Sequence, residues 1–250
     1  MQTNFFTNPY REHDKTTRWF KENVRDPLKD RWKVLMATVI FRRFNYIPTG
    51  EILSEHRLLE HWDSRVCLDV LNGREKTFTG AFMISSPNGK KKLPEICRMI
   101  DAQWGDRELY LKEIMKEGTL EHAWRTLQSE HHRGLMPYEV VTDLRHTSLL
   151  WNAQDVDTWA YFGPGGQRGM ARMLGIPVRG ADPCCLPQET CLEYAQELLA
   201  ITRSSLPEMN KVERFEMREI EHSLCETDKY LRIASGGRGK RKFLGGLEHV

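Results

Sequence analysis

Apolar residues recur every three or four positions along most of the chain, and this spacing constrains the fold more than any other feature of the sequence. Trp32, Leu35, Met36, Val39 and Ile40 follow it, and so do the segments 192–201 and 213–231. Such spacing places apolar side chains on one face of a helix, whereas the alternation typical of strands occurs over no useful length. The sequence therefore predicts an all-α, multi-helix fold.

Turn residues divide this pattern into separate helices. Asp26-Pro27 interrupts it between residues 15 and 45, so we expect two helices there, and Asn72-Gly73 ends the pattern that continues from residue 52. Thr119 is placed to cap a helix that begins at Leu120. Further helices are expected over residues 93–100, 109–115, 138–150, 155–160 and 170–174, with a loop at 86–89 and an irregular connection at 182–187.

Length and composition limit the class of protein. The 250 residues suffice for one large domain or two small ones, and we expect a single helical domain over 1–250. A mean hydropathy of −0.58 indicates a soluble globular protein, and no apolar run approaches the length that spans a membrane. The N-terminus has no secretory signal pattern, so the expected location is the cytoplasm.

The cysteines and histidines do not form a recognisable metal-binding pattern. Six cysteines are irregularly spaced, and the adjacent pair Cys184-Cys185 is a poor start for a disulfide framework, so we expect free thiols. Neither a Cys-x2-Cys pair nor a His-Glu-x-x-His motif is present. No metal site and no cofactor are predicted.

Basic residues gather in two short clusters although the net charge is only +2. One cluster is Lys90-Lys91-Lys92, and the other lies at residues 238–242 within a glycine-rich tail over 235–250. Each cluster is either a solvated loop or a contact for phosphate groups.

The glycine-rich segment Gly163-Pro164-Gly165-Gly166-Gln167-Arg168-Gly169 lies between two expected helices. It is neither a Walker loop nor a dinucleotide-binding fingerprint. Over about 155–175 it resembles the helix-hairpin-helix element of DNA glycosylases, although Gln167 stands where that element has its second glycine. Backbone N–H groups and the Arg168 guanidinium would then bind a DNA phosphate. The alternative is an ordinary turn between helices.

A second candidate segment, Phe41 to Tyr46, combines arginines, an amide and aromatic rings at the end of a helix. Arg42 and Arg43 could hold a pyrophosphate, and Asn45 could recognise the edge of a base. The alternative is core packing with a solvated pair of charges.

The third candidate set is the polar face of the helix expected at 138–150. Glu139, Asp143 and His146 are spaced at i, i+4 and i+7 and so share one face, while Arg145 points elsewhere. A carboxylate there could act as a general base. A buried network of caps and salt bridges is the alternative.

Together these segments, with Phe78 to Phe82 and Glu221 to Tyr230, resemble a phage family, the alpha-glutamyl/putrescinyl-thymine pyrophosphorylases or amino acid:DNA transferases. The resemblance runs from about Lys15 to Lys242, and the same helical scaffold accompanies the P-loop of 5-hydroxymethyluracil DNA kinases. It implies that an amine, such as glycine, glutamate or putrescine, displaces pyrophosphate from an activated thymine in DNA. A DNA base kinase is then an expected partner.

The resemblance assigns roles to the candidate residues. Asp143 or Glu139 would deprotonate the amine, and Arg42, Arg43, Asn45 and Arg145 would hold the pyrophosphate and the base. Gly163, Gly165, Gly166 and Arg168 would contact the DNA backbone.

Two other functions fit the same residues. One is a non-catalytic helical DNA-binding module that partners a separate kinase. The other is a base-excising glycosylase, for which only Asp182 lies at a suitable distance after the glycine segment.

Overall fold

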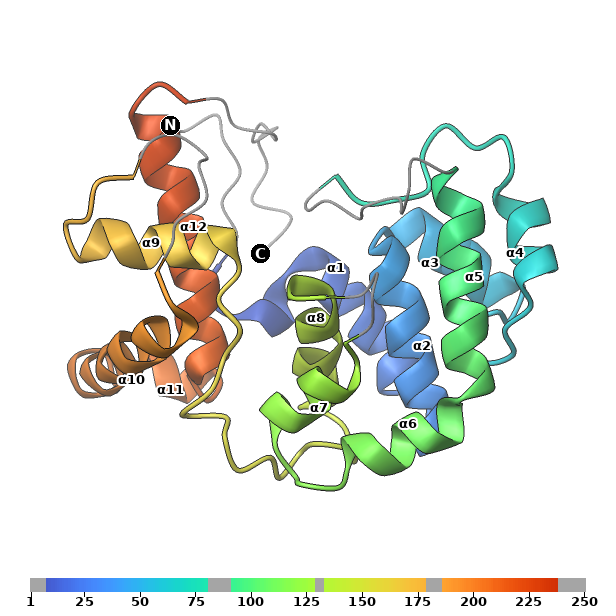
Figure 1. Ribbon diagram of the computed structural model, residues 1–250, viewed down its shortest axis with the longest axis horizontal. Coiled ribbons are helices and arrows are strands. Elements are labelled where there is room, and N and C mark those ends of the chain that lie inside the picture. The colour runs from blue at the N-terminus through green and yellow to red at the C-terminus, as the bar shows by residue number, and fades with distance from the viewer. Residues whose placement is uncertain (1–7, 81–90, 129–132, 179–185, 238–250) are drawn as a thin grey trace. The chain divides into compact units, whose positions relative to one another are not determined.

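The chain is all-helical in the computed structural model, which describes residues 8–80, 91–128, 133–178 and 186–237 (Figure 1). No strand occurs within these ranges, which confirms the predicted fold class. The chain divides into two compact units. Unit 1 comprises Met1–Lys15 and Gln154–Val250, and unit 2 comprises Thr16–Ala153. No described helix is both long enough and apolar enough to cross a bilayer.

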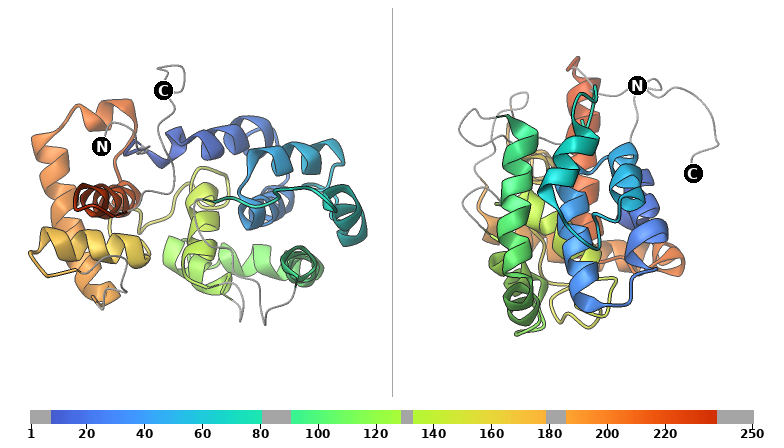
Figure 2. Two further views of the ribbon diagram at one scale, coloured as in Figure 1. Left: turned by 90° about the horizontal axis from the view of Figure 1, so that it is seen from above. Right: turned by 90° about the vertical axis from the view of Figure 1, so that its right-hand side faces the viewer.

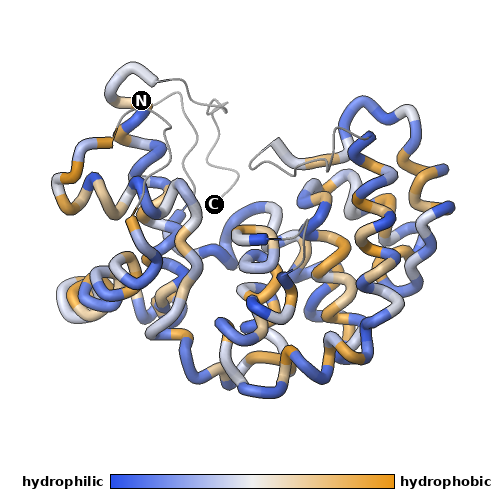
Figure 3. The backbone as a smooth tube through the Cα atoms, viewed as in Figure 1, coloured by the Kyte–Doolittle hydropathy of each residue, from blue (hydrophilic) through white to orange (hydrophobic). Residues whose placement is uncertain are grey.

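Unit 2 is built around α2, whose sequence carries an almost unbroken apolar run from Val34 to Phe41 (Figure 3). Both α5 and α8 pack against it, and every residue of α2 from Val34 to Phe44 is buried. The helical elements of this unit are α1 (Lys15–Phe20), the π-helical turn η2 (Lys21–Arg25), α2 (Arg31–Phe44), α3 (Ile47–Glu55), α4 (Ser64–Leu71), α5 (Lys92–Gly105), α6 (Arg107–Ile114), α7 (Leu120–Thr126) and α8 (Leu135–Leu144).

Unit 1 is organised by two helices that pack across each other, α9 (Pro164–Met173) and α12 (Met217–Ala234). Figure 2 shows the chain from two further directions. Its elements are the 3-10 turn η1 (Arg11–His13), α9 (Pro164–Met173), α10 (Gln188–Ser205), α11 (Met209–Val212) and α12 (Met217–Ala234). The N-terminal segment packs on α12, since Glu12 on η1 pairs with Arg218 at 3.3 Å. The described residues before α1 therefore belong to the same unit as the last helices.

Most predicted helix positions are confirmed. The chain breaks between η2 and α2 at Asp26-Pro27, and α4 ends at Leu71, immediately before Asn72-Gly73. Thr119 caps α7, because its hydroxyl accepts a hydrogen bond from the His122 backbone N–H at 3.2 Å. The predicted loop at 86–89, residues 182–185 of the predicted connection at 182–187, and the basic residues Lys90 and 238–242 lie outside the described residues.

One predicted helix is shorter than expected, and another does not form. The helix expected at 138–150 ends at Leu144, where the backbone changes to shorter-range bonds such as His146 N–H to Asp143 carbonyl. Residues 154–158 form turns rather than a helix. The Val156 carbonyl accepts instead from the Met217 N–H of α12, so tertiary contacts take the backbone bond that a helix would use.

The glycine-rich segment is therefore not a hairpin between two helices, which corrects the expected helix-hairpin-helix element. Gly163 is the N-cap of α9, Pro164 is its first residue, and the remaining glycines lie inside the helix. Proline is favoured at the first helical position because it lacks an N–H that would have no partner there. The helix consequently begins six residues earlier than the apolar pattern indicates.

Candidate functional site

A charged cluster lies buried in unit 2, where the last turn of α2 faces α8. Arg42 donates from Nε to Asp143 Oδ2 at 2.5 Å and from Nη2 to Asp143 Oδ1 at 2.7 Å. Both residues are fully buried. A two-point guanidinium–carboxylate pair shielded from water is among the strongest polar contacts in proteins, and its planar geometry fixes both side chains.

The remaining donors of Arg42 are also occupied. Nη1 donates to Asn45 Oδ1 at 2.8 Å, and Nη2 also donates to Thr17 Oγ1 at 3.0 Å. The guanidinium lies 5.9 Å from the ring centroids of both Phe20 and Phe41. The buried cation is thus satisfied by fixed polar and aromatic groups, which makes Arg42 an organising residue of the cluster.

Glu139 lies one turn before Asp143 on α8 and is the second carboxylate of the cluster. Its Oε2 is 3.7 Å from Arg42 Nη1, and its side chain keeps 10% of its exposure, against 0% for Asp143. A second cation, Arg25, places Nη1 3.8 Å from Asp143 Oδ1 and is itself buried. Among these four charged residues, Glu139 is therefore the one nearest to solvent.

Asn45 connects this cluster to the next helix. It adopts a left-handed backbone conformation, with φ 46° and ψ 41°, and its N–H bonds to the Phe41 carbonyl at 2.7 Å. Asparagine tolerates this conformation better than most residues, and its side-chain oxygen is held by the hydrogen bond from Arg42. The turn ends α2 and makes Tyr46 the N-cap of α3.

Arg43 points away from the cluster, although the sequence places it beside Arg42. Its Nη2 donates to Gln103 Oε1 at 2.7 Å, its Nη1 lies 3.7 Å from the sulfur of Met99, and its Nε is buried without a hydrogen-bond partner. Burial lowers the pKa of the Arg43 guanidinium to about 9. The structure therefore separates the two arginines that were expected to act together.

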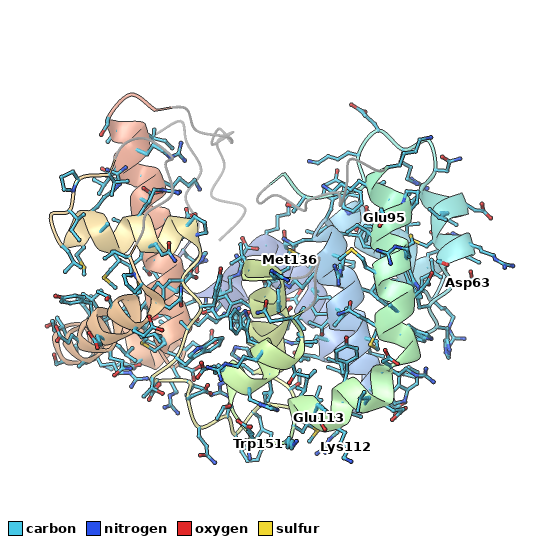
Figure 4. The ribbon with its side chains drawn as sticks, viewed as in Figure 1. Asp63, Glu95, Lys112, Glu113, Met136 and Trp151 are labelled. Carbon is cyan, nitrogen blue, oxygen red and sulfur yellow. The ribbon has the colours of Figure 1, made fainter. Side chains whose placement is uncertain are left out.

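Arg145 and His146 lie beyond the end of α8. Arg145 donates from Nη1 to the backbone carbonyl of Trp151 at 2.6 Å, and Figure 4 labels Trp151 in the turn that follows α8. His146 is exposed. Because the helix ends at Leu144, the predicted polar face includes Glu139 and Asp143 but does not extend to His146.

The glycines of α9, in unit 1, allow a close approach to α12. A Cβ atom built on Gly169 would lie 2.0 Å from the Leu224 carbonyl oxygen, and one on Gly165 would lie 2.5 Å from Cys225 Sγ. A Cβ on Gly166 would meet Glu221 Oε1 at 3.0 Å. Gly169 needs glycine because a Cβ there would meet backbone atoms of α12, whereas at Gly165 and Gly166 it would meet side chains that would have to shift. The sequence analysis did not assign this packing role to the three glycines.

Arg168 also contacts α12. Its Nε donates to Asp228 Oδ2 at 2.9 Å, and Arg172 donates to the other oxygen of the same carboxylate at 2.9 Å. Asp228 is almost fully buried. The sequence suggested Arg168 as a phosphate ligand, and the structure shows that one of its nitrogens serves the α9–α12 contact.

The thiols and the candidate metal ligands form no further site in the described ranges. Cys67, Cys97, Cys191 and Cys225 form no disulfide bond, and the Sγ atoms of Cys67 and Cys97 lie 3.7 Å apart in the core of unit 2. No group of three or more potential metal ligands occurs among the described residues. The candidate chemistry therefore concerns the charged cluster.

Comparison with known proteins identifies the family of the chain. Residues 1–238 match the family model described as 5-hmdU DNA kinase, helical domain. The chain belongs to this family of helical domains. No curated protein and no solved structure gives a match. The family is named after a kinase that acts on 5-hydroxymethyl-deoxyuridine in DNA, and this chain is related to the helical part of that enzyme.

Two members of the cluster were missed by sequence reasoning. Thr17 and Arg25 come from α1 and η2, and neither carries a motif that distinguishes it from a surface residue. One local signal was available for Arg25. It directly precedes Asp26-Pro27 and therefore lies at the end of a helical segment, η2, which packs on α2. The approach of that segment to α8 is a tertiary feature, which no local pattern encodes.

Proposed function

We propose that this chain acts on 5-hydroxymethyluracil-derived bases in DNA and that it catalyses displacement of pyrophosphate from the activated base by an amine. The observation that carries the proposal is family membership over residues 1–238, in a chain whose unit 2 holds a preorganised charged cluster at the α2–α8 contact. The sequence contains no Walker loop, so the phosphorylation step would belong to another chain or domain.

The proposed step exchanges one bond for another at the exocyclic methylene carbon of the base. The amine nitrogen forms a C–N bond, the C–O bond to pyrophosphate breaks, and the bonding electrons leave with the pyrophosphate. The nitrogen then loses one proton to a base. An enzyme accelerates such a step by holding the two reactants in line and by receiving that proton.

Glu139 is the residue we propose as the base. It is the most exposed carboxylate of the cluster, while Asp143 is fully buried and bound at two points to Arg42. Asp143 and Arg42 are then positioning residues that hold α2 and α8 together beneath Glu139. Among the arginines suggested for pyrophosphate, Arg145 is half-buried whereas Arg42 and Arg43 are buried, so we assign the anion contact to Arg145.

The test uses the full-length chain and DNA that contains 5-pyrophosphoryloxymethyl-uracil. The protein is incubated with this DNA and glycine, glutamate or putrescine, and the digested nucleosides are analysed by mass spectrometry. We expect an amine adduct with wild-type protein and none with Glu139→Gln, which keeps the size of the side chain. Glu95→Gln is a matched control, because Glu95 is also a buried helical glutamate of unit 2 and lies on α5 (Figure 4). Absence of an adduct with every amine tried would refute the transferase.

A second function is favoured by the buried state of the cluster. A DNA-binding module that partners a base kinase would need the Arg42–Asp143 pair only for stability, and the family model is itself named as one domain of a kinase. This alternative predicts DNA affinity that falls steeply with salt and no turnover.

The DNA contact of the α9 N-terminus is common to the transferase and to this alternative. Gly163, Gly165, Gly166 and Arg168 are the proposed contacts, and Arg168→Ala should weaken DNA binding. Arg172→Ala is the matched control, since it removes the other half of the contact to Asp228. Equal affinities of the two variants would show that Arg168 acts only in helix packing.

A further inference from the structure

A pocket of about 350 Å³ opens where α3 begins, against the segment that follows α4. Both sides of the pocket come from unit 2. Its lining combines an aromatic ring, apolar side chains, two cations and one carboxylate. These residues are Tyr46, Pro48, Thr49, Ile52, Arg74, Glu75 and Lys76.

The two sides of the pocket are joined by hydrogen bonds. The Thr49 hydroxyl donates to the Thr77 carbonyl at 2.8 Å, and the Thr79 N–H donates to the Phe44 carbonyl at 2.9 Å. The left-handed turn at Asn45, held by Arg42, sets the position of Tyr46. The wall of the pocket is therefore preorganised by the buried cluster described above.

The cations of the pocket have no carboxylate partner among the described residues. Lys76 places its ammonium 4.6 Å from the centroid of the Tyr46 ring, and Arg74 uses only Nε, which donates to the Val70 carbonyl at 2.8 Å. Both side chains are exposed. Their remaining donors are therefore available to an anion.

The same segment carries a second pair of a ring and a cation. Phe78 stacks on Phe44 with ring centroids 5.3 Å apart, and the Lys92 ammonium lies 4.3 Å from the Phe78 centroid. Aromatic rings interleaved with lysine and arginine are the composition by which proteins bind unpaired nucleic acid, with rings that stack on bases and cations that hold phosphates.

We infer that this pocket binds one unpaired nucleotide of a DNA strand. The base lies against Tyr46, its flanking phosphates contact Arg74 and Lys76, and the Glu75 carboxylate is an acceptor for an N–H on the edge of the base. The volume lies at the small end of the range for ligand pockets, which suits a single extruded nucleotide rather than a duplex. The inference rests on the proposed function in one respect, because it takes DNA as the substrate.

The experiment measures binding of a fluorescein-labelled single-stranded oligonucleotide to the full-length chain by anisotropy, over a series of salt concentrations. Tyr46→Leu removes the ring but keeps an apolar side chain, and we expect affinity to fall about tenfold. Arg74→Gln and Lys76→Gln should each reduce the slope of log affinity against log salt by about 0.7, the value for one phosphate contact on a single strand. Because both side chains are exposed, these two variants are expected to fold.

Lys112→Gln is the matched control. Lys112 is an exposed lysine of unit 2 that lies on α6 (Figure 4), and its replacement should leave both the affinity and the salt slope unchanged. The inference is overturned if the three pocket variants bind within about twofold of wild type with unchanged salt slopes, if the matched duplex binds as tightly as the single strand, or if wild type binds no oligonucleotide.

These outcomes are separable from the fate of the transferase. Pocket variants that bind poorly, in a protein that forms no amine adduct, would support the nucleotide site and refute the transfer reaction. Pocket variants that bind normally, in a protein that does form the adduct, would refute the site and leave the reaction standing.

Discussion

Replacement of Gly169 by alanine tests the close packing of α9 on α12. In most helices this change is stabilising by about 1 kcal/mol, because alanine has the higher helix propensity. Here the added Cβ would lie 2.0 Å from the Leu224 carbonyl oxygen and 2.6 Å from its carbonyl carbon, so both contacts are with backbone atoms that cannot rotate away. The helices must separate until the first distance reaches at least about 3 Å, the closest approach usual for a Cβ in a packed interior.

The free energy lost on separation comes from poorer packing and from stretched hydrogen bonds. Overpacking of this kind costs about 1–3 kcal/mol. The two hydrogen bonds from Arg168 and Arg172 to Asp228, both 2.9 Å, would also be stretched, at about 1 kcal/mol each. After subtraction of the gain in helix propensity, Gly169→Ala should destabilise unit 1 by roughly 2–4 kcal/mol, or lower its melting temperature by roughly 10 °C or more.

Thermal unfolding followed by circular dichroism measures the effect, and hydrogen exchange locates it. Amides of α9 and α12 should lose protection, while those of α2 and α8 in unit 2 should keep theirs. Gly105→Ala is the control, because Gly105 ends α5 and a Cβ there meets nothing within 4 Å. A Gly169→Ala protein that melts at or above the wild-type temperature would refute the packing argument.

Further variants test three buried polar groups. Burial raises the pKa of Glu219 from 4.5 to about 7, so the folded protein binds its proton more tightly than the unfolded chain, and stability from this group is lost as pH rises from about 4.5 to about 7. The loss is about 3 kcal/mol, and Glu219→Gln, which keeps the bond to the Glu216 N–H, should abolish it in urea denaturation over that pH range. Asp143→Ala removes the carboxylate that binds the buried Arg42 cation at two points and should cost about 3–5 kcal/mol, a loss that a second change, Arg42→Met, partly reverses in the same denaturation assay. Asn45→Gly should cost about 1 kcal/mol for the hydrogen bond to Arg42, and Asn45→Ala about 1 kcal/mol more because alanine is strained at φ 46°; equal stabilities of these two variants would contradict the second part.

Local sequence patterns correctly predicted those helix ends and caps that depend on neighbouring residues. The interruption at Asp26-Pro27, the cap at Thr119 and the end of α4 before Asn72-Gly73 depend on the dihedral angles and hydrogen bonds of a few neighbouring residues. The helix predicted at 155–160 does not form, and the Val156 carbonyl accepts its hydrogen bond from Met217 of α12, which is distant in the sequence. The packing role of the glycines in α9 was missed for the same reason, because it depends on which helix packs against them.

The sequence by itself determined the all-helical fold and the residue types of the candidate site, because helical periodicity and side-chain chemistry are local properties. The tertiary structure alone decided which of those residues meet. It brought Arg42, Asn45, Glu139 and Asp143 into one cluster because α8 packs against the face of α2 that carries Arg42. Arg43 points about 100° away on the same helix, and only the packing of α5 decided that it meets Gln103. It also placed Tyr46, at the start of α3, opposite Lys76, in the segment that follows α4, a pairing that no spacing in the chain could encode.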